Sequence, residues 1–360
     1  MIMQQGNKLN QERRLSIPVD LIRTIAIVGV ILLHAANDLT IQQMGQLEIV
    51  RWWTVDIYQS LGRIGVPLFV MLTGALLLQP SKNESISVFF KKRWARIGLP
   101  FIFWGAVYFA YDFLVLHQAI TTNAIVQGIL TGPYYHFWYL YMLIGLYLLT
   151  PILRILIAHA DNKIMKYFAI LWFLGAAIIP FAGLLTTYHL DSNILTITGM
   201  VGYFVLGAAL LNVKMRRSVV VIIMSFGIAL TVIGTYALAA TIGGGTMFFF
   251  QEYLSPSMIL ASVMLFLLLI TLKPAEDNKE IKPSKGNKLL KLISQNTLPL
   301  FLFHVMVLES LQAGYFGFAI NGNTINSIIG VPLITFITLF ICLAVIIPLK
   351  KVPLLKQLIG

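Results

Sequence analysis

Apolar runs long enough to cross a membrane recur along the whole chain, and they constrain the fold more than any other feature. A transmembrane helix needs about 20 mostly apolar residues to span about 30 Å of hydrocarbon. Runs of this kind predict helices near 20–38, 57–79, 97–116, 136–157, 166–186, 194–211, 218–240, 256–272, 297–315 and 326–349. With 58% hydrophobic and 11% charged residues, a soluble globule of this size would lack polar surface. We therefore predict an all-α, polytopic integral membrane bundle of about ten transmembrane helices.

No soluble domain interrupts these runs, which predicts that one membrane domain occupies most of the chain. We expect a cytoplasmic N-terminal segment at 1–19, a membrane domain at 20–349 and a cytoplasmic basic tail at 350–360. Ahead of the third span, residues 84–96 place apolar side chains before a Lys-Lys-Arg cluster, a pattern typical of an interfacial helix.

The 26 Lys and Arg residues fall mostly in alternate loops between the predicted spans. Cytoplasmic loops carry an excess of these residues, so the pattern predicts a multi-pass protein of the cell membrane with both termini in the cytoplasm. The net charge of +12 is spread over these loops rather than gathered on one soluble module, which argues against a nucleic-acid partner. The single cysteine, Cys342, lies in the last apolar run, and no cluster has metal-ligand spacing, so we predict neither an intrachain disulfide nor a metal site.

The first predicted span carries four ionisable residues: Asp20, Arg23, His34 and Asp38. Such residues are costly at hydrocarbon depth and usually face a cavity or one another. At 100° per residue, His34 is offset by about 20° from Arg23, and Asp38 returns to the angle of Asp20, so all four share one helix face. This face is the first place to look for a functional site.

Arg23 and His34 are too far apart to contact each other, because eleven residues of helix cover roughly 16 Å. That length is comparable to an extended phosphopantetheine arm, so Arg23 could bind the anionic part of a carrier while its thioester reaches His34. Asp38 could accept a proton from one imidazole nitrogen and leave the other free as a base. The alternative is structural, with Asp20 and Arg23 paired at the interface and His34 bonded to a neighbouring helix.

Five segments form a recognisable series: VDLIRTIAIVGVILLHAAND in the first span, GRIGVPLFVMLTGALLL in the second, KKRWARIGLPFIFW before the third, HFWYLYMLIGLYLLTPIL in the fourth and NTLPLFLFHVMVLE in the ninth. In this order they resemble the motifs of the membrane acyltransferase-3 family. The resemblance covers residues 18 to about 349. Thr73 and Ala75 depart from the second-span motif, which commonly has serine and a bulkier residue at these positions.

The resemblance implies transfer of an acyl group from coenzyme A in the cytoplasm to an acceptor at the outer side of the membrane. It implies that His34 is the catalytic histidine and Arg23 its motif partner, and we place Asp38 with them as the orienting carboxylate. An imidazole can accept the proton of a sugar hydroxyl at neutral pH, which favours general-base catalysis by His34. An acyl-histidine intermediate is the other possibility.

The donor is expected to be acyl-CoA, with acetyl-CoA as the simplest form. Arg93 and Arg96 are three residues apart and can share one helix face, and their guanidinium groups suit the phosphates of coenzyme A. We assign them, with Asp20, to donor binding. Ordinary positive-inside charge is the alternative, and for Lys91 and Lys92 we prefer it.

Five further residues are candidates for substrate binding: Arg63, His136, Trp138, Tyr139 and His304. Aromatic residues at the start of the fourth span could form a platform for a sugar, although Trp and Tyr also anchor helices at interfaces. Arg63 could bind an anionic substrate or pair with Asp56 or Asp112. Glu309 lies about 140° from His304 around the helix, so the two are not expected to form a dyad.

We therefore predict a membrane O-acyltransferase that acts on a hydroxyl of an extracytoplasmic or lipid-linked saccharide. An exporter or flippase of glycan intermediates is the main alternative, since it would also need a polar path through a helix bundle. A non-catalytic scaffold would leave the intramembrane charges unexplained.

Overall fold

The computed structural model describes residues 18–37, 49–79, 84–119, 121–185, 199–272, 285–321 and 324–360, and this part of the chain contains no strand. The α-helices are α2 Val19–Asn37, α3 Ile49–Arg63, α4 Gly65–Leu77, α5 Ile86–Arg93, α6 Leu99–Leu114, α7 Thr122–Thr131, α8 Trp138–His159, α9 Asn162–Phe173, α10 Ile179–Leu185, α11 Gly199–Ala209, α12 Arg217–Thr241, α13 Pro256–Ile270, α14 Lys285–Gln295, α15 Thr297–Ala313, α16 Ser327–Leu349 and α17 Pro353–Ile359. Five short segments are π or 3₁₀ helices: η1 Trp94–Gly98, η2 Tyr135–Phe137, η3 Leu174–Ile178, η5 Leu210–Asn212 and η6 Gly244–Gln251.

The described residues contain eight helical stretches that are long and apolar enough to cross a membrane. A ninth is obtained if α14 and α15, which are bent by 81° at their junction, form one broken span. The remaining predicted span corresponds to the shorter apolar helix Gly199–Asn212, and part of its window lies outside the described residues. The polytopic membrane helical bundle predicted from the sequence is thus confirmed.

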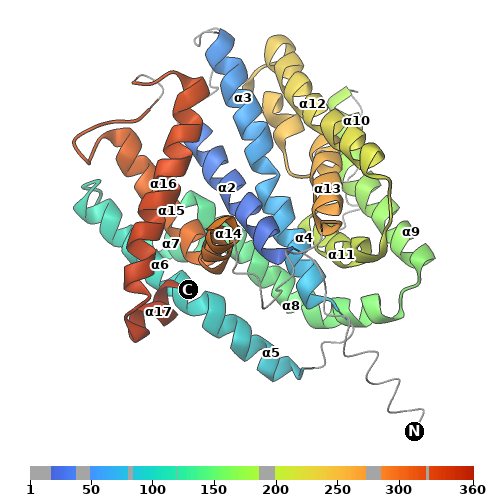
Figure 1. The fold of residues 1–360 in the computed structure, drawn as a ribbon, viewed down its shortest axis with the longest axis horizontal. Helices are drawn as coiled ribbons and strands as arrows, with labels where there is room; N and C mark the ends of the chain where they lie inside the picture. The colour runs from blue at the N-terminus through green and yellow to red at the C-terminus, as the bar shows by residue number, and fades with distance from the viewer. Residues whose placement is uncertain are drawn as a thin grey trace.

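Helix α2 lies in the middle of the bundle, with α3, α4, α14, α15 and α16 packed around it (Figure 1). Small residues allow the closest of these contacts. A side chain at Gly62 or Gly65 would overlap the backbone of α2, near Gly29 and Ala26 respectively. Small residues commonly permit such close helix packing in membranes. The first span, which carries Arg23 and His34, is therefore held rigidly by its neighbours.

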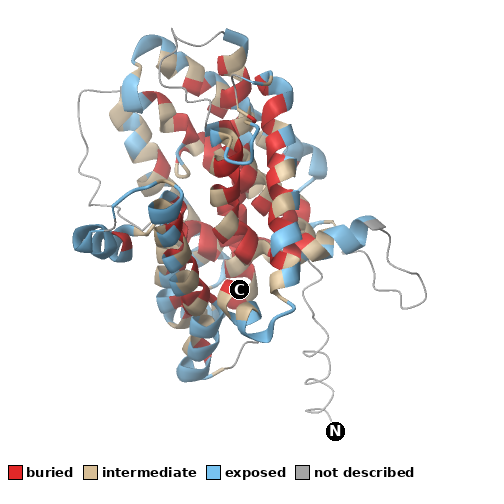
Figure 2. Cartoon of the chain, turned by 90° about the vertical axis from the view of Figure 1, so that its left-hand side faces the viewer, coloured by how far each residue is buried: buried red, intermediate tan, exposed pale blue. Residues whose placement is uncertain are grey.

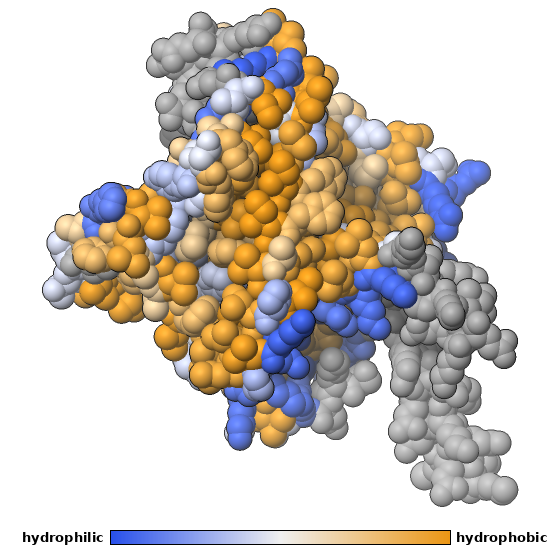
Figure 3. Space-filling view, turned by 60° about the vertical axis from the view of Figure 1, so that its left-hand side comes forward, coloured by the Kyte–Doolittle hydropathy of each residue, from blue (hydrophilic) through white to orange (hydrophobic). Residues whose placement is uncertain are grey.

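The buried residues form a column through the centre of the molecule, and exposed residues lie around it (Figure 2). Many exposed residues are large and apolar, for example Ile152, Ile155 and Ile222, each about two-thirds exposed. On the face drawn in Figure 3, hydrophobic residues form a broad continuous area and hydrophilic ones gather towards its edges. Such a surface is expected where the solvent is lipid.

The third predicted span begins earlier than its apolar window, because α5, η1 and α6 join into one helical stretch from Ile86 to Leu114. Its 29 residues exceed the roughly 17–25 needed to cross the hydrocarbon. The α5 end, where Ile86 and Val88 are exposed, therefore extends beyond a hydrocarbon-length span.

Candidate functional site

A cavity of about 310 Å³ opens at the N-terminal end of α2. Three arginines line it: Arg23 from α2, Arg93 from α5 and Arg96 from η1. We call it the arginine cavity. Its walls also include Thr73, Leu76, Tyr139, Tyr147, Ser294 and Phe301. Guanidinium groups are planar and donate hydrogen bonds in a fork that matches phosphate or carboxylate groups, so the cavity suits an anion.

Arg93 and Arg96 reach the cavity through an irregular helix. Arg93 ends α5, and Arg96 lies in the π-helical turn Trp94–Gly98, where each turn is wider than in an α-helix. The sequence predicted that both arginines share one face, but it gave no sign of this π-helical turn. π-Helical turns occur frequently at functional sites.

Arg93 is held by aromatic rings rather than by a carboxylate. Its guanidinium carbon lies 5.2 Å from the centre of the Phe89 ring and 5.8 Å from that of Tyr147. Arg154, from α8, lies 4.9 Å from the centre of the same Phe89 ring. Cation–π contacts of this kind fix the direction of a guanidinium group without neutralising its charge.

Glu84 neutralises basic groups beside the cavity. Its carboxylate accepts hydrogen bonds from Lys92 Nζ at 2.8 Å and from Arg154 Nη2 at 3.3 Å. The Lys92 hydrogen bond, supported by Arg154, holds the pKa of Glu84 below its ordinary value. Both ion pairs found among the described residues involve Glu84. The arginines that line the cavity form no ion pair within the described part of the chain, so their charges are available to a ligand.

Asp20 forms a hydrogen bond with another helix, α14, whereas the structural alternative paired it with Arg23 of its own helix. Its Oδ1 accepts a hydrogen bond from Ser294 Oγ at 2.6 Å, and it forms no ion pair with Arg23 although the structure describes both residues. Thr24 Oγ1 donates to the Leu290 carbonyl at 3.2 Å. These two bonds fasten the start of α2 to α14, and Ser294 brings this contact to the cavity wall.

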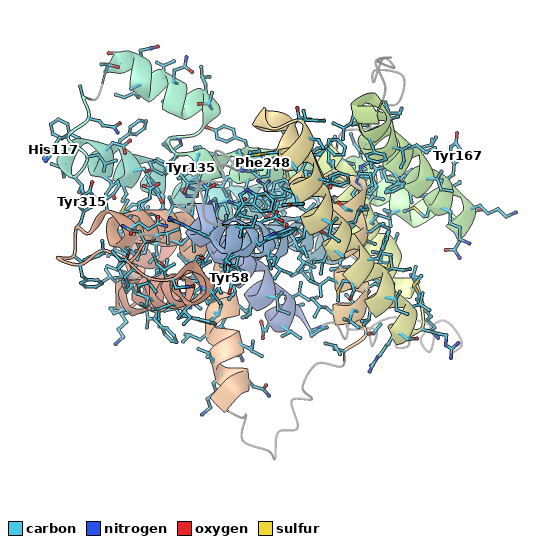
Figure 4. All side chains as sticks on the ribbon, turned by 90° about the horizontal axis from the view of Figure 1, so that it is seen from above. Tyr58, His117, Tyr135, Tyr167, Phe248 and Tyr315 are labelled. Carbon is cyan, nitrogen blue, oxygen red and sulfur yellow. The ribbon has the colours of Figure 1, made fainter. Side chains whose placement is uncertain are left out.

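Three histidines from distant segments converge farther along α2. The ring centroid of His34 lies 5.2 Å from that of His304 in α15, which lies 5.6 Å from that of His136 in η2. We call these three residues the histidine cluster. His136 and His304 are fully buried, whereas His34 is partly exposed. The Tyr135 ring lies 5.3 Å from His34, and Tyr135 is about half exposed. Figure 4 shows Tyr135 on the same side of the molecule as His117, which lies nearer the edge.

The histidine cluster and the arginine cavity share a wall. Phe301 and Tyr139 both line the cavity, and their ring centroids are 5.0 Å apart. The Phe301 ring also lies 5.5 Å from His136 and 5.9 Å from His304. The predicted substrate residue Tyr139 therefore lies on the arginine side, separated from the histidines by a single aromatic layer.

His304 has a defined tautomer. Its Nδ1 lies 2.8 Å from the Phe301 carbonyl and 3.1 Å from the Leu300 carbonyl. Because a carbonyl oxygen can only accept, Nδ1 carries the proton. Nε2 is then unprotonated, and it is buried with no hydrogen-bond partner among the described residues.

His136 is packed against Tyr108, with ring centroids 5.2 Å apart. The Tyr108 hydroxyl donates to the Leu302 carbonyl at 3.0 Å and accepts from the Met306 amide at 3.3 Å. The His136 ring approaches the same Leu302 carbonyl, but neither ring nitrogen forms a well-aligned hydrogen bond with a described residue. The Tyr108 hydroxyl thus forms hydrogen bonds with α15 on both sides of His304, at Leu302 and Met306. The sequence did not reveal this role.

Arg63, the last residue of α3, lies close enough to His34 to act on it electrostatically. Its guanidinium carbon is 5.8 Å from the centre of the Tyr253 ring, which lies 5.6 Å from the ring of Trp138. Neither of the carboxylates considered as partners, Asp56 and Asp112, forms an ion pair with Arg63 in the described part of the chain. The charge of Arg63 is therefore not neutralised by an ion pair among the described residues.

Other predicted polar residues lie where the helical geometry indicates. Glu309 accepts a hydrogen bond from the Tyr134 hydroxyl and not from His304, so the expectation that they form no dyad is confirmed. Asp56 is buried and accepts from Gln251 Nε2 at 2.6 Å. His117 and His159, which lie near the ends of helices, are exposed. Asp38, predicted to orient His34, lies outside the described residues.

The comparisons agree with the resemblance seen in the motifs. The acyltransferase-3 family model, described as an acyltransferase domain, matches residues 18–347 and so covers nearly the whole chain. No curated protein and no solved structure gives a significant match. The matched range includes every described residue of the arginine cavity except Gly360 and all of the histidine cluster. The chain belongs to the acyltransferase-3 family and is a multi-pass membrane acyltransferase that transfers groups other than aminoacyl groups.

Proposed function

We propose that the protein transfers an acyl group, acetyl in the simplest case, from acyl-CoA to a hydroxyl of an extracytoplasmic or lipid-linked saccharide. One observation carries the proposal: an anion-binding cavity and a histidine cluster share the wall formed by Phe301 and Tyr139. Acyl transfer from coenzyme A needs these two features side by side, because the donor joins several phosphates to a reactive thioester.

The arginine cavity is proposed to bind the phosphates of the donor. Arg23, Arg93 and Arg96 all line the cavity, and none forms an ion pair with a carboxylate of the described residues. Arg23 and His34 are separated by roughly 16 Å along α2, a distance that the pantetheine arm can cover. The thioester would then lie beside the histidine cluster, past Tyr139 and Phe301.

His34 is proposed to act as the general base. As the acceptor oxygen attacks the thioester carbon, a carbon–oxygen bond forms, the proton of the hydroxyl passes to His34, and the carbon–sulfur bond breaks. The thiolate leaves with the electron pair and takes the proton from His34, which returns the base to its neutral form. A positioned base typically contributes 10²–10⁴ in rate. Arg63, Trp138 and Tyr253 lie on the acceptor side, where an aromatic and cationic surface suits a sugar or its anionic substituent.

The orientation of the protein follows from the donor. Acyl-CoA is a cytoplasmic metabolite, so the arginine cavity is proposed to open to the cytoplasm, as the positive-inside rule also predicts. In a background without Cys342, Thr122→Cys should react with an impermeant maleimide on intact cells and Ser87→Cys should not. Both residues are exposed in the structure. Labelling of Ser87→Cys with no labelling of Thr122→Cys would reverse the orientation.

The function is tested with purified protein in proteoliposomes that contain a lipid extract from its own cells. Acetyl-CoA labelled in the acetyl group is added, and lipid and glycan fractions are analysed for the label. We expect time-dependent labelling that depends on His34. Absence of label with several acyl-CoA chain lengths, together with export of unmodified glycan intermediates, would favour the exporter.

A further inference from the structure

His304 lies beside His34, and hydrogen bonds to its own helix fix its ring. It belongs to α15, which begins after the 81° bend that separates it from α14. The side chain is completely buried, and the Phe301 ring that contacts it also lines the arginine cavity. Burying a histidine costs free energy unless its ring nitrogens form hydrogen bonds.

The two nitrogens of His304 have different environments. Nδ1 donates to the backbone of its own helix, at the Phe301 and Leu300 carbonyls, which leaves Nε2 as an acceptor that faces away from α15. His34 and His136 are the histidines whose rings lie next to it, at 5.2 and 5.6 Å between centroids. Nε2 has no hydrogen-bond partner among the described residues. The hydrogen bonds between Nδ1 and the α15 backbone therefore leave Nε2 as an acceptor beside His34.

The nearest acidic side chain on α15 is engaged elsewhere. Glu309 accepts a hydrogen bond from Tyr134, one helical turn beyond His304. Asp20, at the other end of α2, accepts from Ser294. Among the described residues, the group that faces His34 from α15 is thus a neutral acceptor and not a carboxylate.

We propose that His304 is the positioning residue of His34, an inference that rests on the proposed function. The Nε2 of His304 accepts a hydrogen bond from one ring N–H of His34, which fixes the His34 tautomer and leaves its other nitrogen unprotonated towards the acceptor hydroxyl. When His34 takes the hydroxyl proton, the same hydrogen bond stabilises the imidazolium. The proton on His304 Nδ1 stays in place throughout, so His304 itself is never charged.

The resting geometry suits this role. The two rings are adjacent, but no hydrogen bond joins them in the structure, since Nε2 of His304 has no described partner. Catalytic hydrogen bonds are often long or poorly aligned without substrate and tighten in the reactive complex. A neutral acceptor also avoids the high cost of burying an ionised carboxylate in a site that must remain largely dry.

Two substitutions separate the two nitrogens of His304. His304→Asn places an amide near the position of Nδ1, so it keeps the bond to the α15 backbone and loses the acceptor that faces His34. His304→Gln places an amide near the position of Nε2, so it keeps an acceptor there and loses the backbone bond. We expect the Asn variant to lose at least about tenfold in kcat with little change in KM for acetyl-CoA or acceptor. The Gln variant should keep most of the wild-type kcat.

A His34→Ala, His304→Asn double variant completes the test. If His304 acts through His34, the second substitution adds no further loss to the first. The inference is overturned if His304→Asn has wild-type kcat, if only KM changes, if Gln is inactive while Asn is active, or if neither variant accumulates in the membrane. Wild-type protein that transfers no label from any acyl-CoA contradicts the proposed function instead, so the two failures are distinguishable.

Discussion

The arginine cavity and the histidine cluster lie on either side of Phe301 and handle polar groups in opposite ways. At the cavity, aromatic rings fix the guanidinium of Arg93, and a nearby carboxylate, Glu84, pairs with Lys92 and Arg154, so positive charge remains for a ligand. At the histidine cluster, the imidazoles are packed among aromatic rings, and a backbone bond fixes the tautomer of one of them. The difference indicates that one side is built to bind an anion and the other to move a proton.

The largest effect is expected from the histidine side. His34→Ala should lower acyl transfer at least about a hundredfold, because a general base contributes 10²–10⁴ in rate. His34→Gln should be nearly as slow, since an amide forms hydrogen bonds but cannot accept the proton. Rates are measured with labelled acetyl-CoA, and accumulation in the membrane is the control. Near-normal transfer by His34→Gln would move the base elsewhere, with His304 as the first candidate.

Substitutions in the arginine cavity should weaken donor binding and leave the rate of the chemical step largely unchanged. Replacing Arg93 and Arg96 together by Gln should weaken coenzyme A binding by roughly tenfold or more, because bonds between guanidinium and phosphate are charge-assisted. The matched control replaces Lys91 and Lys92 by Gln, which removes the same charge from α5 outside the cavity. Equal losses of affinity in the two double variants would show that net charge, and not the cavity, attracts the donor.

A smaller effect should follow from loosening Arg93 without removing it. Phe89→Leu keeps a buried apolar side chain but removes the ring that Arg93 and Arg154 contact. We expect a loss of a few-fold in coenzyme A affinity, in line with about 0.5–2 kcal/mol for a cation–π contact. Phe90→Leu, at the next position, is the control and should bind normally. Equal affinities would assign Phe89 to packing alone.

The smallest effect concerns Glu84, which lies outside the membrane-spanning segments. Its pKa is lowered by the Lys92 hydrogen bond and by Arg154, so the folded state gains stability wherever the unfolded carboxyl would be ionised, and loses it as pH falls through the lowered value. Glu84→Gln should therefore lower the stability above about pH 5 by no more than about 1 kcal/mol, with the difference vanishing in acid. Thermal unfolding at several pH values measures it; a difference that grows in acid would contradict the pairing.

Much of the helical bundle could be predicted from the sequence. The length of an apolar segment and the angle between two residues around a helix are both local properties. The apolar windows located the helices, and the shared face of Arg23 and His34 followed from their spacing. The four-residue spacing of Phe89 and Arg93 also favours contact on one helix.

The meeting of the histidines could not be predicted in this way. His34, His136 and His304 are brought together by packing between α2, η2 and α15, which no local pattern encodes. The bend before α15 has a partial signal in Asn296 and Pro299, residues typical of a helix start, but its 81° angle depends on the surrounding helices. The π-helical turn at Arg96 has no sequence signal that we recognise.

The central claim is that binding and proton transfer are divided between the two sides of Phe301. The most direct test measures coenzyme A affinity and single-turnover acyl transfer in the same preparations of wild type, His34→Ala and the Arg93→Gln, Arg96→Gln variant. The account predicts that His34→Ala binds coenzyme A normally but transfers at least about a hundredfold more slowly. It predicts that the arginine variant binds weakly yet recovers most of its transfer rate at saturating donor. A His34→Ala protein that no longer binds coenzyme A, or an arginine variant that stays slow at saturation, would contradict that division.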